Sequence, residues 1–223
     1  MNNMLSTGVE VYLDELIERY PKLSECKESI QKAYIILKTS YLNGGKLLVA
    51  GNGGSAADSE HIVGELMKSF RRPRPILKDM MDKICAVDKD RGNKIVKVLE
   101  CSLPAISLVS QTALSTAYLN DIGDSGIFAQ QVLGYGILGD IFWGISTSGN
   151  SENVIDAAIV AKAKGLSVIS LTGINGGLLE TYSDVCIKVP ERETFKVQEF
   201  HLPIYHCLCL MLEEYFFSED FSL

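Results

Sequence analysis

Residues 46–66, KLLVAGNGGSAADSEHIVGEL, join a short apolar run to a glycine-rich turn and then to a helix-like segment. The run Lys46 to Ala50 lacks the alternation of a half-exposed strand and is typical of a strand covered on both faces. The glycines let the backbone turn sharply, and Ser55 can cap the helix that follows. This stretch predicts a buried strand that leads directly into a helix, the repeating unit of layered α/β folds.

The same pattern occurs again along the chain. Further apolar runs, each ended by a loop, are Pro104 to Val109, Asp140 to Ser146, Ser167 to Thr172 and Val185 to Val189. With the first run, they predict an α/β doubly wound sandwich with a central parallel sheet flanked by helices. A final apolar helix is expected over about Thr194 to Phe217, with a kink at Pro203.

Two segments lie outside this pattern. Residues 1–40 have apolar positions at helical spacing and are divided by Pro21 into two helices without an intervening strand. Their apolar stripes must pack on the rest of the domain or on another subunit, and we expect the second. Residues 71–101 carry 9 basic and 5 acidic residues and predict either a short helical insertion on the surface or a mobile lid over the active site.

Composition limits the function. A chain of 223 residues with 47% hydrophobic residues is expected to be one globular domain, residues 1–223. A net charge of −7 argues against binding to nucleic acid or to an anionic membrane surface. No apolar stretch is long enough for a membrane span, and the six cysteines form no CxxC pair. We therefore expect a cytoplasmic protein with reduced cysteines.

Two loops at predicted strand ends suit an anion. The first, residues 51–55, combines glycines with Asn52 and Ser55 at a helix start; the second, Ser146 to Ser151, carries four hydroxyls before the next helix. Unpaired N–H groups at a helix start bind phosphate, and hydroxyls add hydrogen bonds without a fixed positive charge. Glycine and a capping serine also have a structural use in any such turn. The two loops together, with Thr172 and Gly173 at the same sheet edge, predict a phosphate-ester site.

The chain has only three histidines. His61 and Glu65 are four residues apart on one helix face, and Gln198 and His206 can share a face of the last helix, from which His201 should point away. A cluster of His61, Glu65, Gln198 and His206 would suit a divalent metal such as zinc, or an acid/base pair without metal. Each histidine alone could equally be a hydrogen-bonded core residue.

The motifs GNGGSAADSEHIVGEL (51–66), ISTSGNSENV (145–154), AKAKGLSVISLTG (161–173) and VQEFHLPIYH (197–206) together resemble the SIS (sugar isomerase) domain family, specifically the sedoheptulose-7-phosphate isomerases. The resemblance covers about residues 8–217 except the insertion. It implies a SIS-type three-layer sandwich with five parallel strands, and a cytoplasmic homotetramer with shared active sites and N-terminal helices used in oligomer packing. It also implies a zinc ion, one per chain, held by His61, Glu65, Gln198 and His206.

The resemblance further implies a role for each matching residue. Glu65 and His206 would be the catalytic acid and base, in either order, and the substrate would be held by Asn52, Gly53, Ser55, Asp121, Ser146, Thr147, Ser148, Ser151 and Gln198. The implied reaction interconverts sedoheptulose 7-phosphate and D-glycero-D-manno-heptose 7-phosphate through an enediol. Such a reaction needs a base, an acid and stabilisation of the enediol(ate), or a metal acting as Lewis acid.

The chain also departs from the family pattern. Ser69, beside Lys68, stands where the family commonly has an arginine, and Phe195 stands where it commonly has an aspartate. These departures leave open the isomerisation of another sugar phosphate. A third alternative is a non-catalytic SIS protein that acts through protein contact, like the factor that binds the bacterial replication initiator, although such a protein has no need for the four-residue cluster.

Overall fold

Five parallel strands form the central sheet of the computed structural model, which describes residues 7–123 and 126–218. The strands are β1 (Leu47–Gly51), β2 (Ala105–Ser107), β3 (Ile141–Ser146), β4 (Ser167–Thr172) and β5 (Val185–Lys188), in the order β2-β1-β3-β4-β5. Four of them lie within the predicted apolar runs and β1 extends one residue beyond its run, to Gly51, so the predicted parallel sheet is confirmed. The chain leaves β1 toward β2 on one side and leaves β3 toward β4 on the other. The loops after β1 and β3 therefore diverge, and this is where open α/β sheets bind ligands.

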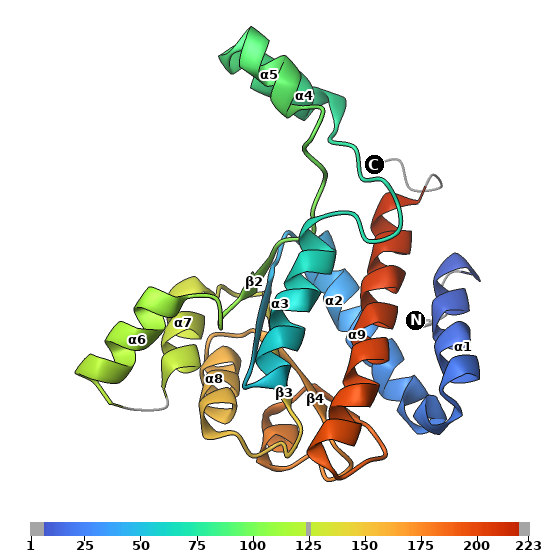
Figure 1. The fold of residues 1–223 in the computed structure, drawn as a ribbon, viewed down its shortest axis with the longest axis vertical. Helices are drawn as coiled ribbons and strands as arrows, with labels where there is room; N and C mark the ends of the chain where they lie inside the picture. Colours follow the sequence, from blue (N-terminus) through green and yellow to red (C-terminus); the bar gives the residue numbers. More distant parts are fainter. Residues whose placement is uncertain (1–6, 124–125, 219–223) are drawn as a thin grey trace.

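Helices cover both faces of the sheet (Figure 1). Alternate strand residues enter separate cores: Leu47 and Val49 pack with α1 (Thr7–Arg19), α2 (Lys27–Leu42), α3 (Gly54–Met67) and α9 (Thr194–Phe217). Leu48 and Ala50 pack on the other face with α7 (Ile127–Tyr135), α8 (Glu152–Ala163) and the short 3₁₀ helix η2 (Leu178–Tyr182). The three-layer sandwich is thus built as its strand pattern predicts, because consecutive side chains of a strand point to opposite faces.

The N-terminal helices bury their apolar stripes in a different place from the one that we expected. Pro21 does end α1, and a short 3₁₀ helix, η1 (Pro21–Cys26), precedes α2. The apolar stripe of α1, with Val9, Leu13 and Leu16, is buried in the same core as α9, and α2 contributes residues to that core as well. These stripes therefore find their cover within the chain, and not on a second subunit as we expected from the sequence.

The insertion forms a helical arm. Helices α4 (Lys78–Val87) and α5 (Lys89–Ile95) stand clear of the body at the end of two extended connections (Figure 1). The helices cross closely, since a Cβ on Gly92 would lie 2.7 Å from Cα of Cys85. Of the residues in these two helices, all of them described, only Gly92 is buried. The prediction of a helical insertion is confirmed, and the arm extends away from the sheet edge that carries the loops.

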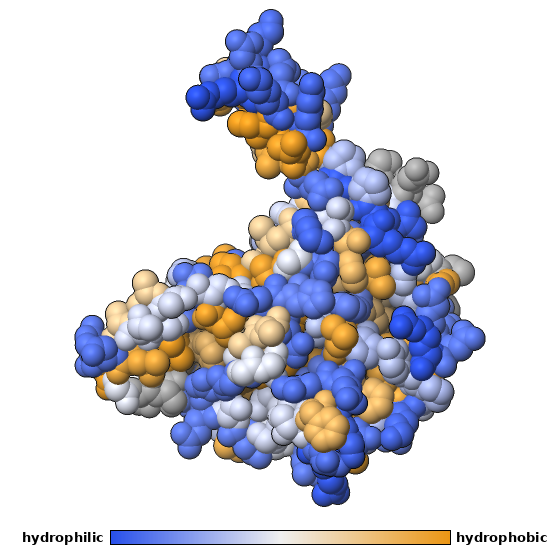
Figure 2. Space-filling view, in the orientation of Figure 1, coloured by the Kyte–Doolittle hydropathy of each residue, from blue (hydrophilic) through white to orange (hydrophobic). Residues whose placement is uncertain are grey.

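A second projection consists of α6 (Thr112–Asp121) and α7, which the sequence reading did not place. Apolar residues gather on it and on the arm (Figure 2). Those exposed on the second projection, or just after one of its helices, are Leu114, Leu119, Ile122, Leu133, Tyr135, Ile137 and Leu138. Among the described helices, none has the length and apolar character required to cross a membrane.

Candidate active site

A polar hollow of about 320 Å³ lies at the carboxyl ends of β1 and β3. It is lined by Asn52, Gly53, Gly54, Ser55, Ile145, Ser146, Thr147, Ser151, Thr194 and Gln198. Seven of the residues expected to hold substrate are thereby brought together, from two loops and the start of α9. The first turns of α3 and α8 begin here, so unpaired backbone N–H groups are available to an anion.

Backbone geometry explains the glycines of this hollow. Gly53 has φ +57°, a left-handed conformation that side chains with a Cβ rarely adopt. A Cβ on Gly54 would lie 2.5 Å from Nε2 of Gln198, so the glycine lets the amide of Gln198 lie directly against the start of α3. The two loops are also joined, because Asn52 and Asn153 exchange two side-chain hydrogen bonds of 2.9 Å. These hydrogen bonds connect the loop after β1 to the first turn of α8.

Two predicted binding residues lie outside the hollow. Ser148 is exposed, and its hydroxyl accepts a hydrogen bond from the backbone N–H of Asn150 at 3.1 Å. Asp121 lies at the end of α6, on the second projection, where its carboxylate accepts from Asn120 at 3.0 Å. Within this chain neither residue lines the hollow.

Three of the four predicted cluster residues meet between α3 and α9. Nε2 of His61 lies 3.0 Å from Oε1 of Glu65 and 3.4 Å from Nε2 of His206. Glu65 is buried, His206 is half-buried and His61 is exposed, so the cluster has a protected carboxylate beneath an accessible imidazole. Lys68 also reaches Glu65, with 3.3 Å between Nζ and Oε2.

Burial and neighbouring charge act on the groups of the cluster. Burial lowers the pKa of His206, and the nearby His61 lowers it further, against a smaller opposing effect of Glu65. The neutral imidazole of His206 is therefore favoured, which suits a proton acceptor or a metal ligand. His201 differs: it is fully buried, and burial lowers its pKa to about 4, against the opposing effect of the Thr172 backbone. His201 is a core histidine away from the cluster, as its helical position predicts.

Gln198 stands apart from the other cluster residues in this structure. It precedes His206 by eight residues on α9, about 12 Å along a helix axis at 1.5 Å per residue. It lines the polar hollow instead. Among the described residues, no three His, Cys, Asp or Glu side chains surround a common centre in the manner of a metal site.

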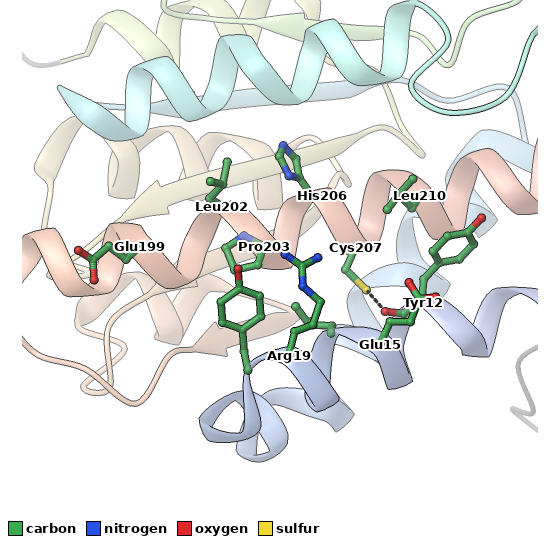
Figure 3. A pocket seen from close by; sticks show the side chains of 11 residues that line it. Tyr12, Glu15, Arg19, Glu199, Leu202, Pro203, His206, Cys207 and Leu210 are labelled. Carbon is green, nitrogen blue, oxygen red and sulfur yellow. Dashed lines mark hydrogen bonds between the residues drawn. The ribbon is translucent and has the colours of Figure 1, made fainter.

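A second hollow, of about 170 Å³, lies between α1 and α9 (Figure 3). His206 borders it, but its ring points away from α1 toward α3. The opposite wall includes Tyr12, Glu15 and Arg19 of α1. This hollow is therefore separate from the cluster at the α3 side of α9.

Several supporting residues were missed by the sequence reading. Tyr205 contacts His61, with 3.0 Å between the hydroxyl and Nδ1, and donates a hydrogen bond to Oδ1 of Asp58 at 3.2 Å. Arg74, 1% exposed, donates to the backbone carbonyls of Leu66 at 2.8 Å and of Glu65 at 3.0 Å. The spacing of Asp58 three residues before His61, on one helix face, was a usable signal. No comparable sequence signal pointed to Arg74, because its partners come from other segments of the chain.

Comparisons with known proteins identify the family of this chain. The model of the SIS domain matches residues 11–95 and 89–173. A phosphoheptose isomerase of Aneurinibacillus thermoaerophilus is 40% identical over 181 residues, 81% of this chain and 78% of that protein. Phosphoheptose isomerase 2 of Campylobacter jejuni is 38% identical over 193 residues, 86% and 83% of the two chains. The solved structure of a phosphoheptose isomerase from Francisella tularensis superposes with a TM-score of 0.72 at 31% identity, covering 92% of this chain and 96% of that one.

The parallel sheet and its flanking helices are those of a SIS domain. The chain belongs to this family, and within it to the phosphoheptose isomerases.

Proposed function

We propose that this protein interconverts sedoheptulose 7-phosphate and D-glycero-D-manno-heptose 7-phosphate, a ketose and an aldose, through an enediol. The named activity of the relatives supports it. Within this chain, the observation that carries the proposal is the position of the polar hollow and the His61 cluster at two levels of the same pair of helices. Gly54 meets Gln198 at one level and His61 meets His206 at the next.

The separation of the two levels suits a seven-carbon substrate. Ser55 and His61 are six residues apart, about 9 Å along α3, and the matching interval on α9 is about 12 Å. An extended seven-carbon sugar phosphate spans about 9 to 10 Å from phosphorus to its first two carbons, given bonds of about 1.5 Å. With the phosphate on the loops, C1 and C2 reach the cluster. Each carbon fewer shortens the reach by about 1 Å.

Proton transfer is assigned to two residues. Glu65 is the base that removes the proton from the carbon beside the carbonyl, and His206, whose neutral imidazole carries one N–H, is the acid that protonates the carbonyl oxygen. As the enediol collapses, Glu65 returns its proton to the neighbouring carbon and His206 takes up the proton of the other hydroxyl. Glu65 is buried, and its carboxylate contacts the exposed His61. It therefore lies between the protein core and the proposed position of the substrate. Backbone N–H groups and hydroxyls of the hollow hold the phosphate and fix the sugar in register with this pair.

A zinc ion is also proposed, with His61, Glu65 and His206 as ligands; Gln198, the fourth expected ligand, lines the polar hollow in this structure and would join them only after a movement of its side chain. The donor types suit zinc, and the separations of 3.0 Å and 3.4 Å about Nε2 of His61 match the ligand-to-ligand edge of about 3.4 Å in a tetrahedral site. When bound, zinc would polarise the oxygens at C1 and C2 as a Lewis acid. We expect about one equivalent of zinc per chain by elemental analysis after incubation with zinc, and loss of that zinc in His61→Ala. Zinc-free wild-type protein would contradict the ligand set.

We further propose a homotetramer with shared active sites. The exposed apolar residues of α6 and α7 offer a packing surface, and Asp121 at the end of α6 could then line the hollow of a neighbouring copy. Light scattering at several protein concentrations tests this assembly. A monomer at micromolar concentration would contradict it.

The function is tested with ketose phosphates of five, six and seven carbons, each with and without a chelator. We expect the seven-carbon ketose to have the highest kcat/KM. The six-carbon ketose should lose about a hundredfold, since a misplacement of about 1 Å at the reacting atoms costs that much. Equal turnover of all lengths would contradict the spacing argument. Absence of turnover would favour a protein that acts by contact.

A further inference from the structure

Two helices of this chain are left without cover. Helix α4 on the arm and helix α6 on the second projection each have 10 residues, and none of the residues in either helix is buried. The two helices lie apart, on separate protrusions of the molecule (Figure 1). Helices shorter than about 12 to 15 residues are marginal on their own in water and are held mainly by packing of an apolar face. Each of the two helices therefore needs a partner beyond the contacts that the described part of one chain provides.

The arm has one apolar face. Leu77, Met80, Ile84 and Val87 follow one another at intervals of three or four residues, which places them on one side of α4. Leu77 is 61% exposed and Val87 is 89% exposed. Figure 2 shows hydrophobic residues on the lower side of the arm, toward the open space above the second projection, and hydrophilic residues on its upper side. An uncovered apolar face with a polar rim is typical of a protein interaction surface.

The second projection offers an apolar face of similar length. Leu114 and Leu119 of α6 and Leu133 of α7 are exposed there. At a rise of about 1.5 Å per residue, α4 and α6 are each about 15 Å long. The two faces can therefore pack along their whole length when they belong to different copies of the chain.

Charge favours the same pairing. Residues 78–97 of the arm carry six basic and four acidic residues, whereas residues 98–161, which include the whole second projection, contain no lysine, arginine or histidine. The net charge of the chain is −7, so two copies repel unless a basic surface of one meets an acidic or neutral surface of the other. Residues 71–101 hold 9 of the 21 basic residues, so the arm supplies that surface. Two arms packed together would instead bring like charges close to each other.

We propose that the arm of one copy packs on the second projection of a neighbouring copy, with the apolar face of α4 against that of α6. A twofold axis repeats such a contact in the opposite direction, so each copy both gives an arm and receives one. The inference rests on the proposed assembly of copies, and it does not depend on which sugar is isomerised.

Two substitutions test the contact without weakening a helix. Leu77 is the N-cap residue of α4 and makes no side-chain cap hydrogen bond, so Leu77→Asp removes apolar area from the arm while it adds a favoured cap. Leu119→Lys places a cation in the last turn of α6, where the helix dipole favours it, and presents that charge to the basic arm. Each variant changes one side of the proposed contact.

Val11→Lys is the control. Val11 is 49% exposed on α1, across the molecule from the second projection (Figure 1). Asp14 and Glu15 lie one turn further along the helix, so the added cation has favourable neighbours there. This variant introduces the same charge on an exposed helix face outside the contact.

Assembly is measured by analytical ultracentrifugation over a range of protein concentrations, with circular dichroism to confirm folding. Leu77→Asp and Leu119→Lys should each raise the apparent dissociation constant about tenfold or more, and Val11→Lys should change it by less than about twofold. An equimolar mixture of the two contact variants should recover part of the assembly. In that mixture, the unchanged arm of one variant meets the unchanged projection of the other.

Hydrogen exchange of the wild-type protein gives a test without any variant. The backbone amides of α4 and α6 should gain protection together as the protein concentration passes the dissociation constant. Protection of one helix without the other would overturn the proposal.

Loss of assembly in Leu77→Asp but not in Leu119→Lys would show that arms pair with each other, and would overturn the proposal. Unchanged assembly in both variants, or no recovery in their mixture, would overturn it as well. Because these measurements use neither substrate nor zinc, they are independent of the isomerase assay. A protein that isomerised no sugar but showed the expected pattern would refute the proposed activity and retain the interface.

Discussion

The buried ion pair of Arg74 and Glu213 allows a quantitative test of how the cluster is supported. The two side chains are 0% and 2% exposed, with 2.8 Å between nitrogen and oxygen. Arg74 also donates to the carbonyls of Glu65 and Leu66 at the end of α3. Glu213 accepts from the backbone N–H groups of residues 70–72. The pair thus joins α9 to the last turn of α3, which carries Glu65.

Removing either partner should lower the free energy of unfolding, and the two losses should differ in size. Breaking a buried pair from one side costs about 3 to 5 kcal/mol, because the other charge is left uncompensated. Arg74→Met leaves Glu213 with its three N–H donors, so we expect about 3 kcal/mol. Glu213→Leu leaves the guanidinium and three backbone N–H groups without their acceptor, so we expect a loss of about 5 kcal/mol. The free energy of unfolding is obtained from urea denaturation, and each kcal/mol should lower Tm by about 2 to 4 °C.

Lys83→Met is the control for this pair. It breaks an ion pair with Asp79 in which the side chains are 65% and 76% exposed, so its effect should stay within about 0.5 kcal/mol. A loss below about 1 kcal/mol in Arg74→Met, or a larger loss in Arg74→Met than in Glu213→Leu, would refute the reasoning.

Three further predictions concern catalysis, phosphate and pH. Glu65→Gln or His206→Asn should each lower the isomerisation rate about a hundredfold or more with an unchanged circular dichroism spectrum, and near-normal turnover would exclude that residue as acid or base. Ser151→Ala should weaken inorganic phosphate binding in calorimetry by roughly 0.5 to 3 kcal/mol, whereas Ser148→Ala, outside the hollow, should change it little; the reverse order would show that the loop rearranges on binding. His201 has a pKa of about 4 when folded against 6.5 as its ordinary value, so the unfolded chain takes up the proton first as pH falls. Its contribution to stability is present above pH 6.5 and is lost toward pH 4, by up to about 3 kcal/mol. His201→Leu should lack this part of the pH dependence in urea titrations, and identical pH profiles would contradict it.

The sheet could be predicted because its strands are covered on both faces. Runs such as 47–51 and 141–145 are continuously apolar, and this signal does not depend on distant partners. The glycine and hydroxyl loops could be placed with them, since parallel strands bring their carboxyl ends to one edge. The cover of α1 could not be predicted, because an apolar stripe does not say which surface it meets. Only the fold shows that α9 offers that surface.

The candidate site could be predicted only in part from the sequence. The pair His61 and Glu65 followed from helical spacing, and its meeting with His206 followed from family resemblance. Tyr205 gave no signal, because a tyrosine on an apolar helix is most often core. The contacts of its hydroxyl are made with His61 and Asp58, which belong to another helix. Asp121 was expected at the hollow, but in a single chain α6 carries it elsewhere.

The most direct test of the central claim is ¹H NMR of sedoheptulose 7-phosphate incubated with the protein in D₂O. An enediol mechanism with Glu65 as base predicts the appearance of aldose anomeric signals and the incorporation of solvent deuterium at C2 of the aldose, with both lost in Glu65→Gln. Absence of aldose and of deuterium exchange with the wild-type protein, or unchanged exchange in Glu65→Gln, would contradict the account.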